Sequence, residues 1–149
     1  MEFPREILQE AQRSIGRTGP MASVVIEEGA VKKFCEAVGD MNPLYIDPEA
    51  AQVTRWHGTI VPPTYLCTLR PESPAVDVDF GTVNLNGGNE YEWFVPVRPG
   101  DTITAQTVIE DVRGVVGRQG PMLIVTRSTV YMNHRGQTVA QGRATSIRK

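Results

Sequence analysis

Residues 102–112 read TITAQTVIEDV, with apolar and polar side chains in alternation. A period of two in a run rich in Val, Ile and Thr predicts a β-strand with one buried face. Working outward, the same pattern recurs in residues 89–95, 122–132 and 137–147. Residues 133–136 (NHRG) are typical of a hairpin turn, and residues 96–101 (PVRPGD) hold too many Pro and Gly residues to continue a strand. The second half of the chain therefore predicts an antiparallel sheet.

The first half predicts short helices. Val31, Phe34, Cys35 and Val38 lie at helical spacing, and Gly39 follows as a stop signal. Helices before strands indicate an α+β fold, a curved sheet with helices on one face, in a single domain spanning residues 1–149. The predicted helices are residues 4–14, 28–38, 48–54 and 62–71, with a short β-run at 22–26.

Composition excludes several classes of function. The chain has 149 residues and a net charge of −2, without the basic patch that nucleic acid or an anionic membrane would require. Cys35 and Cys67 lack partners at metal-ligand spacing and are predicted to be buried, reduced thiols, so neither a disulfide nor a metal site is expected. The charged start and the absence of a long apolar run predict a cytoplasmic protein.

Residues 38–48 read VGDMNPLYIDP and carry the most specific pattern. They resemble the signature of the MaoC-like (R)-specific enoyl-CoA hydratases and dehydratases, Gly-Asp-x-Asn-Pro-(apolar)-His. The resemblance extends over almost the whole chain, through residues 61–64 (VPPT) and 85–92 (LNGGNEYE), and looks most like the N-terminal, FAS1-like dehydratase branch. It implies a hot-dog fold, in which the antiparallel sheet wraps around a central helix opening at Pro62-Pro63. It also implies a double hot dog, in keeping with the edge strand that an isolated sheet exposes.

The resemblance implies roles for three residues of the motif. In the family, the Asp and the His hold a water between them for addition to an enoyl thioester, and the Asn and Pro fix the turn. Asp40 and Asn42 match the motif, but Tyr45 stands at the His position. A phenol has a pKa of about 10, against about 6.5 for imidazole, so Tyr45 is a poor general base at neutral pH.

A second departure concerns the start of the central helix. In the homodimeric hydratases a Gly there donates its backbone N–H to the thioester carbonyl. Pro63 occupies that position here, and proline has no N–H to donate. The loss of the base and the oxyanion donor together predicts a degenerate site.

Several residues have two readings. Asp40 and Asn42 are either turn formers alone, or Asp40 still orients a water with Tyr45 or a partner residue. His57 and Gly58 are predicted to lie near the thioester entrance, where His57 is either a replacement base or a loop residue. Arg98, Arg113 and Arg118 either meet coenzyme A phosphates or are solvated strand ends, and His134 is expected to be exposed in its turn. The residues predicted to line the acyl tunnel, or else to be plain core, are Tyr65, Leu66, Leu69, Tyr91 and Trp93.

These observations favour a subunit of an enoyl-thioester hydratase, or 3-hydroxyacyl-thioester dehydratase, that forms the acyl-binding half beside a second hot dog with an intact site. The partner would be a second copy or a different hot-dog subunit. One alternative is an autonomous homodimeric hydratase using Asp40 with Tyr45 or His57. Others are a non-catalytic acyl-CoA-binding module and, against the motif, a thioesterase. The substrate would be an acyl chain on coenzyme A or an acyl carrier protein, with phosphopantetheine as part of the substrate and no separate cofactor.

Overall fold

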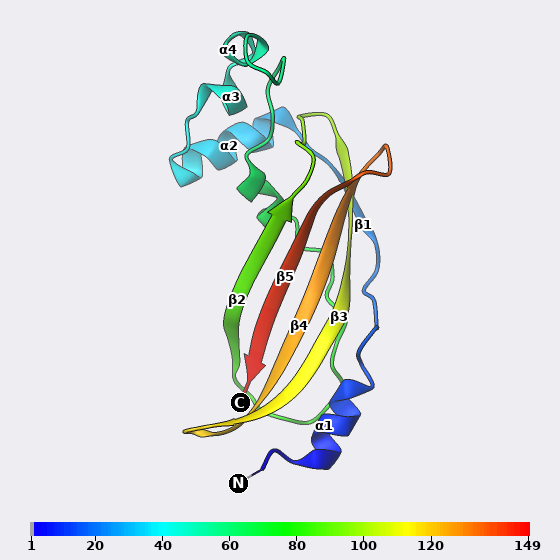
Figure 1. The fold of residues 1–149 in the computed structure, drawn as a ribbon. Coiled ribbons are helices and arrows are strands. Elements are labelled where there is room, and N and C mark those ends of the chain that lie inside the picture. Colours follow the sequence, from blue (N-terminus) through cyan, green and yellow to red (C-terminus); the bar gives the residue numbers. More distant parts are fainter. Residues whose placement is uncertain (1) are drawn as a thin grey trace.

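The computed structural model describes residues 2–149. Its strands are β1 (Ala22–Val25), β2 (Asn84–Trp93), β3 (Thr102–Gly117), β4 (Gly120–Asn133) and β5 (Thr138–Arg148). They form one antiparallel sheet in the order β1-β3-β4-β5-β2. Figure 1 shows the long strands curving together, with β2 along one edge. The α+β class and the curved antiparallel sheet predicted from the sequence are confirmed.

The helices are short and lie at both ends of the sheet. Figure 1 places α1 at one end and α2, α3 and α4 at the other. Helix α2 begins and ends where the periodicity predicts, because Gly39 adopts the left-handed conformation (φ 73°) that terminates a helix. The helices are α1 (Arg5–Gln12), α2 (Glu28–Val38), α3 (Pro43–Ile46), α4 (Pro48–Gln52) and the 3-10 helix η1 (Pro63–Thr68).

The central helix is shorter than the sequence predicts. Instead of continuing to Pro71, η1 ends at Thr68, and residues 69–83 have no regular structure. Leu69 is extended (ψ 98°), and the residue before Pro71 is itself disfavoured in a helix. The concave face of the sheet is consequently covered by separate pieces of chain rather than by one long helix.

Two hydrophobic clusters lie between the sheet and these pieces. One contains Ile26, Val31 and Leu66 and packs against the β3 residues Ile103 and Ala105. The other lies around a β-bulge in β3, between Ile109 and Asp111. There α1 and residues 76–80 cover a buried set consisting of Ala11, Val76, Ile109, Val112, Leu123 and Val125. The core is thus divided along the length of the sheet.

The structure agrees in part with what the sequence predicts for the hairpin turn, the start of β2 and the cysteines. Gly136 has the positive φ (74°) expected of the β4–β5 hairpin turn. Strand β2 begins at Asn84, five residues before the alternating run. Both cysteines are free, but only Cys35 is buried, whereas Cys67 is partly exposed. Within residues 2–149, no helix is both long and apolar enough to cross a membrane.

Candidate functional site

The motif turn connects α2, α3 and α4. Asn42 precedes α3 and its side-chain oxygen accepts a hydrogen bond from the Leu44 N–H at 3.0 Å, while Pro43 occupies the first turn. Asp47 caps α4 in the same way, accepting from Glu49 and Ala50. Asn42 therefore acts as a turn former, which is one of the two readings that the sequence allows.

Capping does not explain Asp40. Its backbone N–H bonds to the Cys35 carbonyl at 2.9 Å, but its exposed carboxylate makes no hydrogen bond or ion pair with any residue between 2 and 149. After burial, the charge of Asp40 is the next cause of the raised pKa values of both the Cys35 thiol and the Tyr45 phenol. The negative charge of Asp40 therefore acts on Tyr45, the residue with which the family resemblance pairs it.

Tyr45 is partly buried and packs against the first hydrophobic cluster. Burial raises the pKa of its phenol above the usual value, and the charges of Asp40 and Cys35 raise it further. Each cause disfavours the phenolate, so at neutral pH Tyr45 carries its proton. It can donate a hydrogen bond to a water or a carbonyl, but it cannot collect a proton from water.

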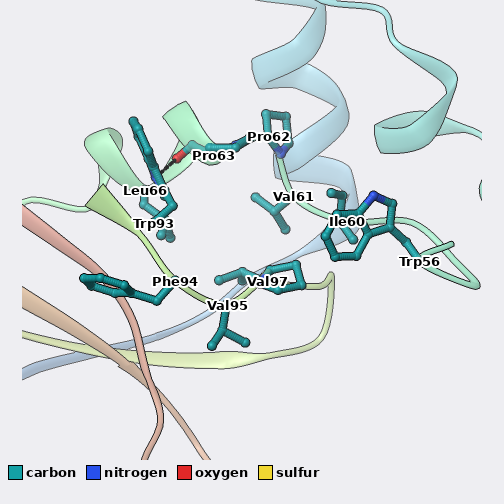
Figure 2. Close-up of a pocket in the computed structure, with 11 residues that line it drawn as sticks. Trp56, Ile60, Val61, Pro62, Pro63, Leu66, Trp93, Phe94, Val95 and Val97 are labelled. Atoms are coloured by element: carbon teal, nitrogen blue, oxygen red, sulfur yellow. Dashed lines mark hydrogen bonds between the residues drawn. The ribbon is translucent and has the colours of Figure 1, made fainter. Parts of the chain in front are cut away.

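An apolar cavity of about 190 Å³ opens beside the start of η1. Figure 2 shows Pro62 and Pro63 on one side of it and Trp93 on another, with the Trp93 indole N–H donating to the Pro63 carbonyl at 2.9 Å. The proline nitrogens have no hydrogen to offer to a thioester at this end of η1. The lining is Trp56, Ile60, Val61, Pro62, Pro63, Leu66, Trp93, Phe94, Val95, Pro96 and Val97.

The loop before η1 is fixed by Arg98. Its guanidinium donates to the Thr59 carbonyl at 3.2 Å and to the Trp56 carbonyl. His57, between them, is exposed, has a positive φ (51°) and forms no ion pair with Asp40. Gly58 has a positive φ (140°), a conformation that favours glycine, and a Cβ there would lie 3.2 Å from the Arg98 guanidinium. These contacts of Arg98 hold the loop in place. Its predicted binding to a coenzyme A phosphate stays a prediction.

The predicted tunnel residues lie close together. Tyr65 meets Phe34 edge-on, with ring centroids 5.4 Å apart, and Leu66 is buried. Tyr91 and Trp93 stack with centroids 5.8 Å apart on the same face of β2. Leu66 and Trp93 line the apolar cavity, whereas Leu69 and Tyr91 line a second, more polar one of about 570 Å³.

Sequence reasoning missed most residues of this second cavity. Thr107 and Thr129 face each other across β3 and β4, with hydroxyl oxygens 2.7 Å apart. A signal was present, because Thr107 takes the inward phase of β3, between Ala105 and Ile109. The cavity is lined by Cys67, Leu69, Arg70, Pro71, Ser73, Asn86, Asn89, Tyr91, Thr107, Thr129, Tyr131 and Ala144.

The remaining candidates lie elsewhere. His134 is exposed in the β4–β5 turn, with Nδ1 4.0 Å from the Asp101 carboxylate. Arg113 pairs with Asp111 at 2.8 Å, and Arg118 is exposed in the β3–β4 turn. Across residues 2–149, no three His, Cys, Asp or Glu side chains gather as a metal site would require.

Comparison with known proteins identifies the family. A family model described as "FAS1-like, dehydratase domain region" matches residues 13–142. The chain belongs to the FAS1-like dehydratase family. This FAS1-like dehydratase domain is 31% identical over 114 residues to a UPF0336 protein of Streptomyces avermitilis, covering 71% of the chain and 75% of that protein. It is 28% identical over 132 residues to a probable enoyl-CoA hydratase alpha subunit of Thermomonospora curvata, covering 76% of the chain and 41% of the subunit.

Solved structures place the FAS1-like dehydratase domain among MaoC-like hot dogs. It superposes on the MaoC-like dehydratase from Rhodospirillum rubrum with a TM-score of 0.68 and 25% identity, covering 90% of this chain and 91% of the other. A chain of the ChsH1-ChsH2 complex from Mycobacterium tuberculosis gives a TM-score of 0.78 at 17% identity, covering 97% and 94%. The predicted hot-dog fold and MaoC-like family are therefore confirmed.

Proposed function

We propose that this chain is the acyl-binding half of an enoyl-thioester hydratase, or 3-hydroxyacyl-thioester dehydratase, and that a second hot-dog domain supplies the catalytic base. The observation that carries the proposal is the environment of Tyr45. Tyr45 stands at the position of the family's histidine in the sequence, and burial and then the negative charge of Asp40 raise the pKa of its phenol, which holds its proton in place. A general base at this position is worth about 10²–10⁴ in rate, and this chain lacks it.

The start of η1 supports the same conclusion. Pro62 and Pro63 have no N–H, and the Pro63 carbonyl is already engaged by Trp93. An oxyanion donor typically contributes a factor of about 10²–10³ in turnover. Loss of base and donor together would leave this half about 10⁴-fold or more below an intact site, while its apolar cavity could still hold an acyl chain.

The exposed edge of the sheet supports pairing. Strand β2 has ten residues, lies at an edge and buries none of its side chains fully. An open strand of this length offers a row of unpaired backbone groups, which natural sheets usually cover. Leu85 and Trp93 are exposed on it, and Phe94 directly follows it. The name of the Thermomonospora curvata relative, an alpha subunit, and the two-protein complex among the structural neighbours are consistent with a partner domain.

The substrate would be a trans-2-enoyl or 3-hydroxyacyl chain on coenzyme A or an acyl carrier protein. In this arrangement Asp40 and Tyr45 hydrogen-bond to solvent or to the thioester without exchanging a proton. The partner's Asp and His activate the water. Residues of this chain around η1 and β2 position the acyl chain and exclude water from it.

A hydration assay tests the proposal. The purified chain is mixed with crotonyl-CoA, and loss of the enoyl thioester is followed by its absorbance. We expect turnover at least about 10⁴-fold below that of an intact hydratase site, and no further loss in Asp40→Asn. Adding a hot-dog domain that carries Asp-x-Asn-Pro-x-His should give an active complex in which Asp40→Asn remains close to wild type.

Asp79→Asn is the matched control, because it makes the same chemical change at an exposed position far along the chain. Rapid hydration by the chain alone, abolished by Asp40→Asn but not by Asp79→Asn, would show an autonomous hydratase instead. Saturable thioester binding without turnover, even beside the second domain, would show a non-catalytic binding module.

A further inference from the structure

The larger cavity borders the first hydrophobic cluster, because Leu69, Tyr91 and Tyr131 belong both to the cavity lining and to that cluster. Its floor is formed by side chains of β3, β4 and β2, including Thr107, Thr129 and Tyr91. Its rim is formed by the segment that follows η1, from Leu69 to Ser73.

The lining carries one cation and no carboxylate. Arg70 stands at the open side of the cavity, and its guanidinium makes no ion pair or hydrogen bond with residues 2–149. The same cavity is lined by Arg70 and by the phenols of Tyr91 and Tyr131. An unpaired guanidinium over a polar floor is suited to a carboxylate, which it can bind through two parallel hydrogen bonds.

The floor adds hydroxyl and amide groups. The Thr107 and Thr129 hydroxyls share one hydrogen bond at 2.7 Å, which leaves one of the two O–H groups free to donate. Tyr131 donates to the Leu69 carbonyl at 3.2 Å and so fixes the rim to the floor. Asn86 accepts from Asn89 at 3.3 Å, which leaves its own amide N–H groups available. A plain alkyl chain ending here would leave these donors unsatisfied, at a free-energy penalty.

Neighbouring side chains on one face of β2 line the two cavities. Trp93 lines the apolar cavity, Tyr91 lines the polar one, and their rings stack 5.8 Å apart. A chain entering beside Pro63 would pass over Trp93 and Tyr91 and end near Arg70. The path is apolar where it begins and rich in donors where it ends.

We propose that this chain selects thioesters whose acyl chain ends in a carboxylate, with the methylenes in the apolar cavity and the distal carboxylate on Arg70. The proposal rests on the acyl-binding function above and adds the substrate class. A monothioester of a straight-chain dicarboxylic acid has the required chemistry.

Paired ligands test the proposal by titration calorimetry on the full chain. The coenzyme A monothioesters of hexanedioic, octanedioic and decanedioic acid are each compared with hexanoyl-, octanoyl- and decanoyl-CoA. We expect at least one dicarboxylic ligand to bind about tenfold or more tightly than its monocarboxylic partner, as one charge-assisted hydrogen bond allows. Arg70→Gln should remove that ratio and leave the monocarboxylic affinity unchanged.

Arg135→Gln is the control for net charge, because it removes one exposed cation from the β4–β5 turn and should leave the ratio intact. A ratio near one at every length, or a ratio that survives Arg70→Gln, would overturn the carboxylate assignment. In that case binding of the monocarboxylic thioesters would leave the acyl-binding function standing. Failure of both series to bind would overturn both proposals.

Discussion

Strand β3 and the second half of β2, from Asn89, have the same alternating sequence pattern but very different surroundings. In β3, the inward side chains Ile103, Ala105 and Ile109 are buried. In β2, nine of the ten residues are exposed, and Tyr91 alone is partly buried. The first strand lies between β1 and β4, whereas the second lies at the edge of the sheet.

The difference shows that alternation reports the polarity of a strand's two faces, but not what covers them. Whether a face is covered depends on the position of the strand in the sheet and on the segments of the chain that pack over it. Over β3, α1 and residues 76–80 close the far half of the concave face. Over β2, η1 is only six residues long and touches one end through the Trp93–Pro63 hydrogen bond. The uncovered strand therefore carries the candidate interface and the candidate ligand path.

The largest loss of stability should come from truncating a buried side chain on the covered strand, β3. Ile109 is 0% exposed and packs with Val112, Leu123 and Val125, so Ile109→Ala should lower the free energy of unfolding by about 2–5 kcal/mol. Urea unfolding, followed by circular dichroism, measures it. Val115→Ala is the control on the same strand, because Val115 is 43% exposed and its truncation should change stability by about 0.5 kcal/mol or less. A change below about 1 kcal/mol for Ile109→Ala would mean that the second cluster is not a tightly packed core.

Local patterns were enough to predict most elements of the fold. The apolar spacing of α2 and the stop at Gly39 gave both ends of that helix. The alternating runs located β3, β4 and β5, although β3 continues to Gly117 because its hairpin with β4 extends beyond the predicted run. These elements are specified by residues within a few positions of one another.

The parts that sequence reasoning missed depend on distant partners. Residues 84–88 (NLNGG) have little strand propensity, yet they form the start of β2 because they pair with residues 145–148 of β5. In the site, the family resemblance paired Asp40 with Tyr45. It could not predict that Arg98 clamps the loop at Thr59, 39 residues earlier, or that Thr107 and Thr129 share a cavity with Arg70.

A smaller loss of stability should come from truncating an exposed side chain on the uncovered strand, β2. Leu85 is 44% exposed, so Leu85→Ala should lower the free energy of unfolding of the isolated chain by about 0.5 kcal/mol or less. The same urea experiment, run in dilute solution, measures it against Ile109→Ala. A loss of about 2 kcal/mol or more, together with an unfolding midpoint that depends on protein concentration, would contradict the contrast between the covered strand β3 and the uncovered strand β2. It would show that a second copy already covers β2 in solution.

The smallest effect on stability should come from the convex face of the sheet. There one residue of β5 contacts side chains of both β3 and β2. Arg143 donates to both carboxylate oxygens of Glu110 on β3, at 3.0 and 2.8 Å, and lies 3.6 Å from Glu90 on β2. The hydrogen bonds from Arg143 and then Ser128 lower the pKa of Glu110 below its usual value. Because the folded-state pKa is the lower one, the stabilisation is complete above about pH 4.3 and is lost as pH falls through the folded-state pKa.

The Glu110 side chain is 38% exposed, so solvent screening limits the effect of Glu110→Gln to about 0.5 kcal/mol at pH 7. The difference from wild type, measured by urea unfolding, should shrink toward zero as the pH is lowered below about 4. Glu92→Gln, on β2 opposite Gln141 and without an ion pair to residues 2–149, controls for the loss of one negative charge and should show a smaller change. A loss of equal size at both pH values would mean that Glu110 acts through packing at the bulge rather than through its charge. The coupling of β3 to the open edge would then not depend on the ion pair.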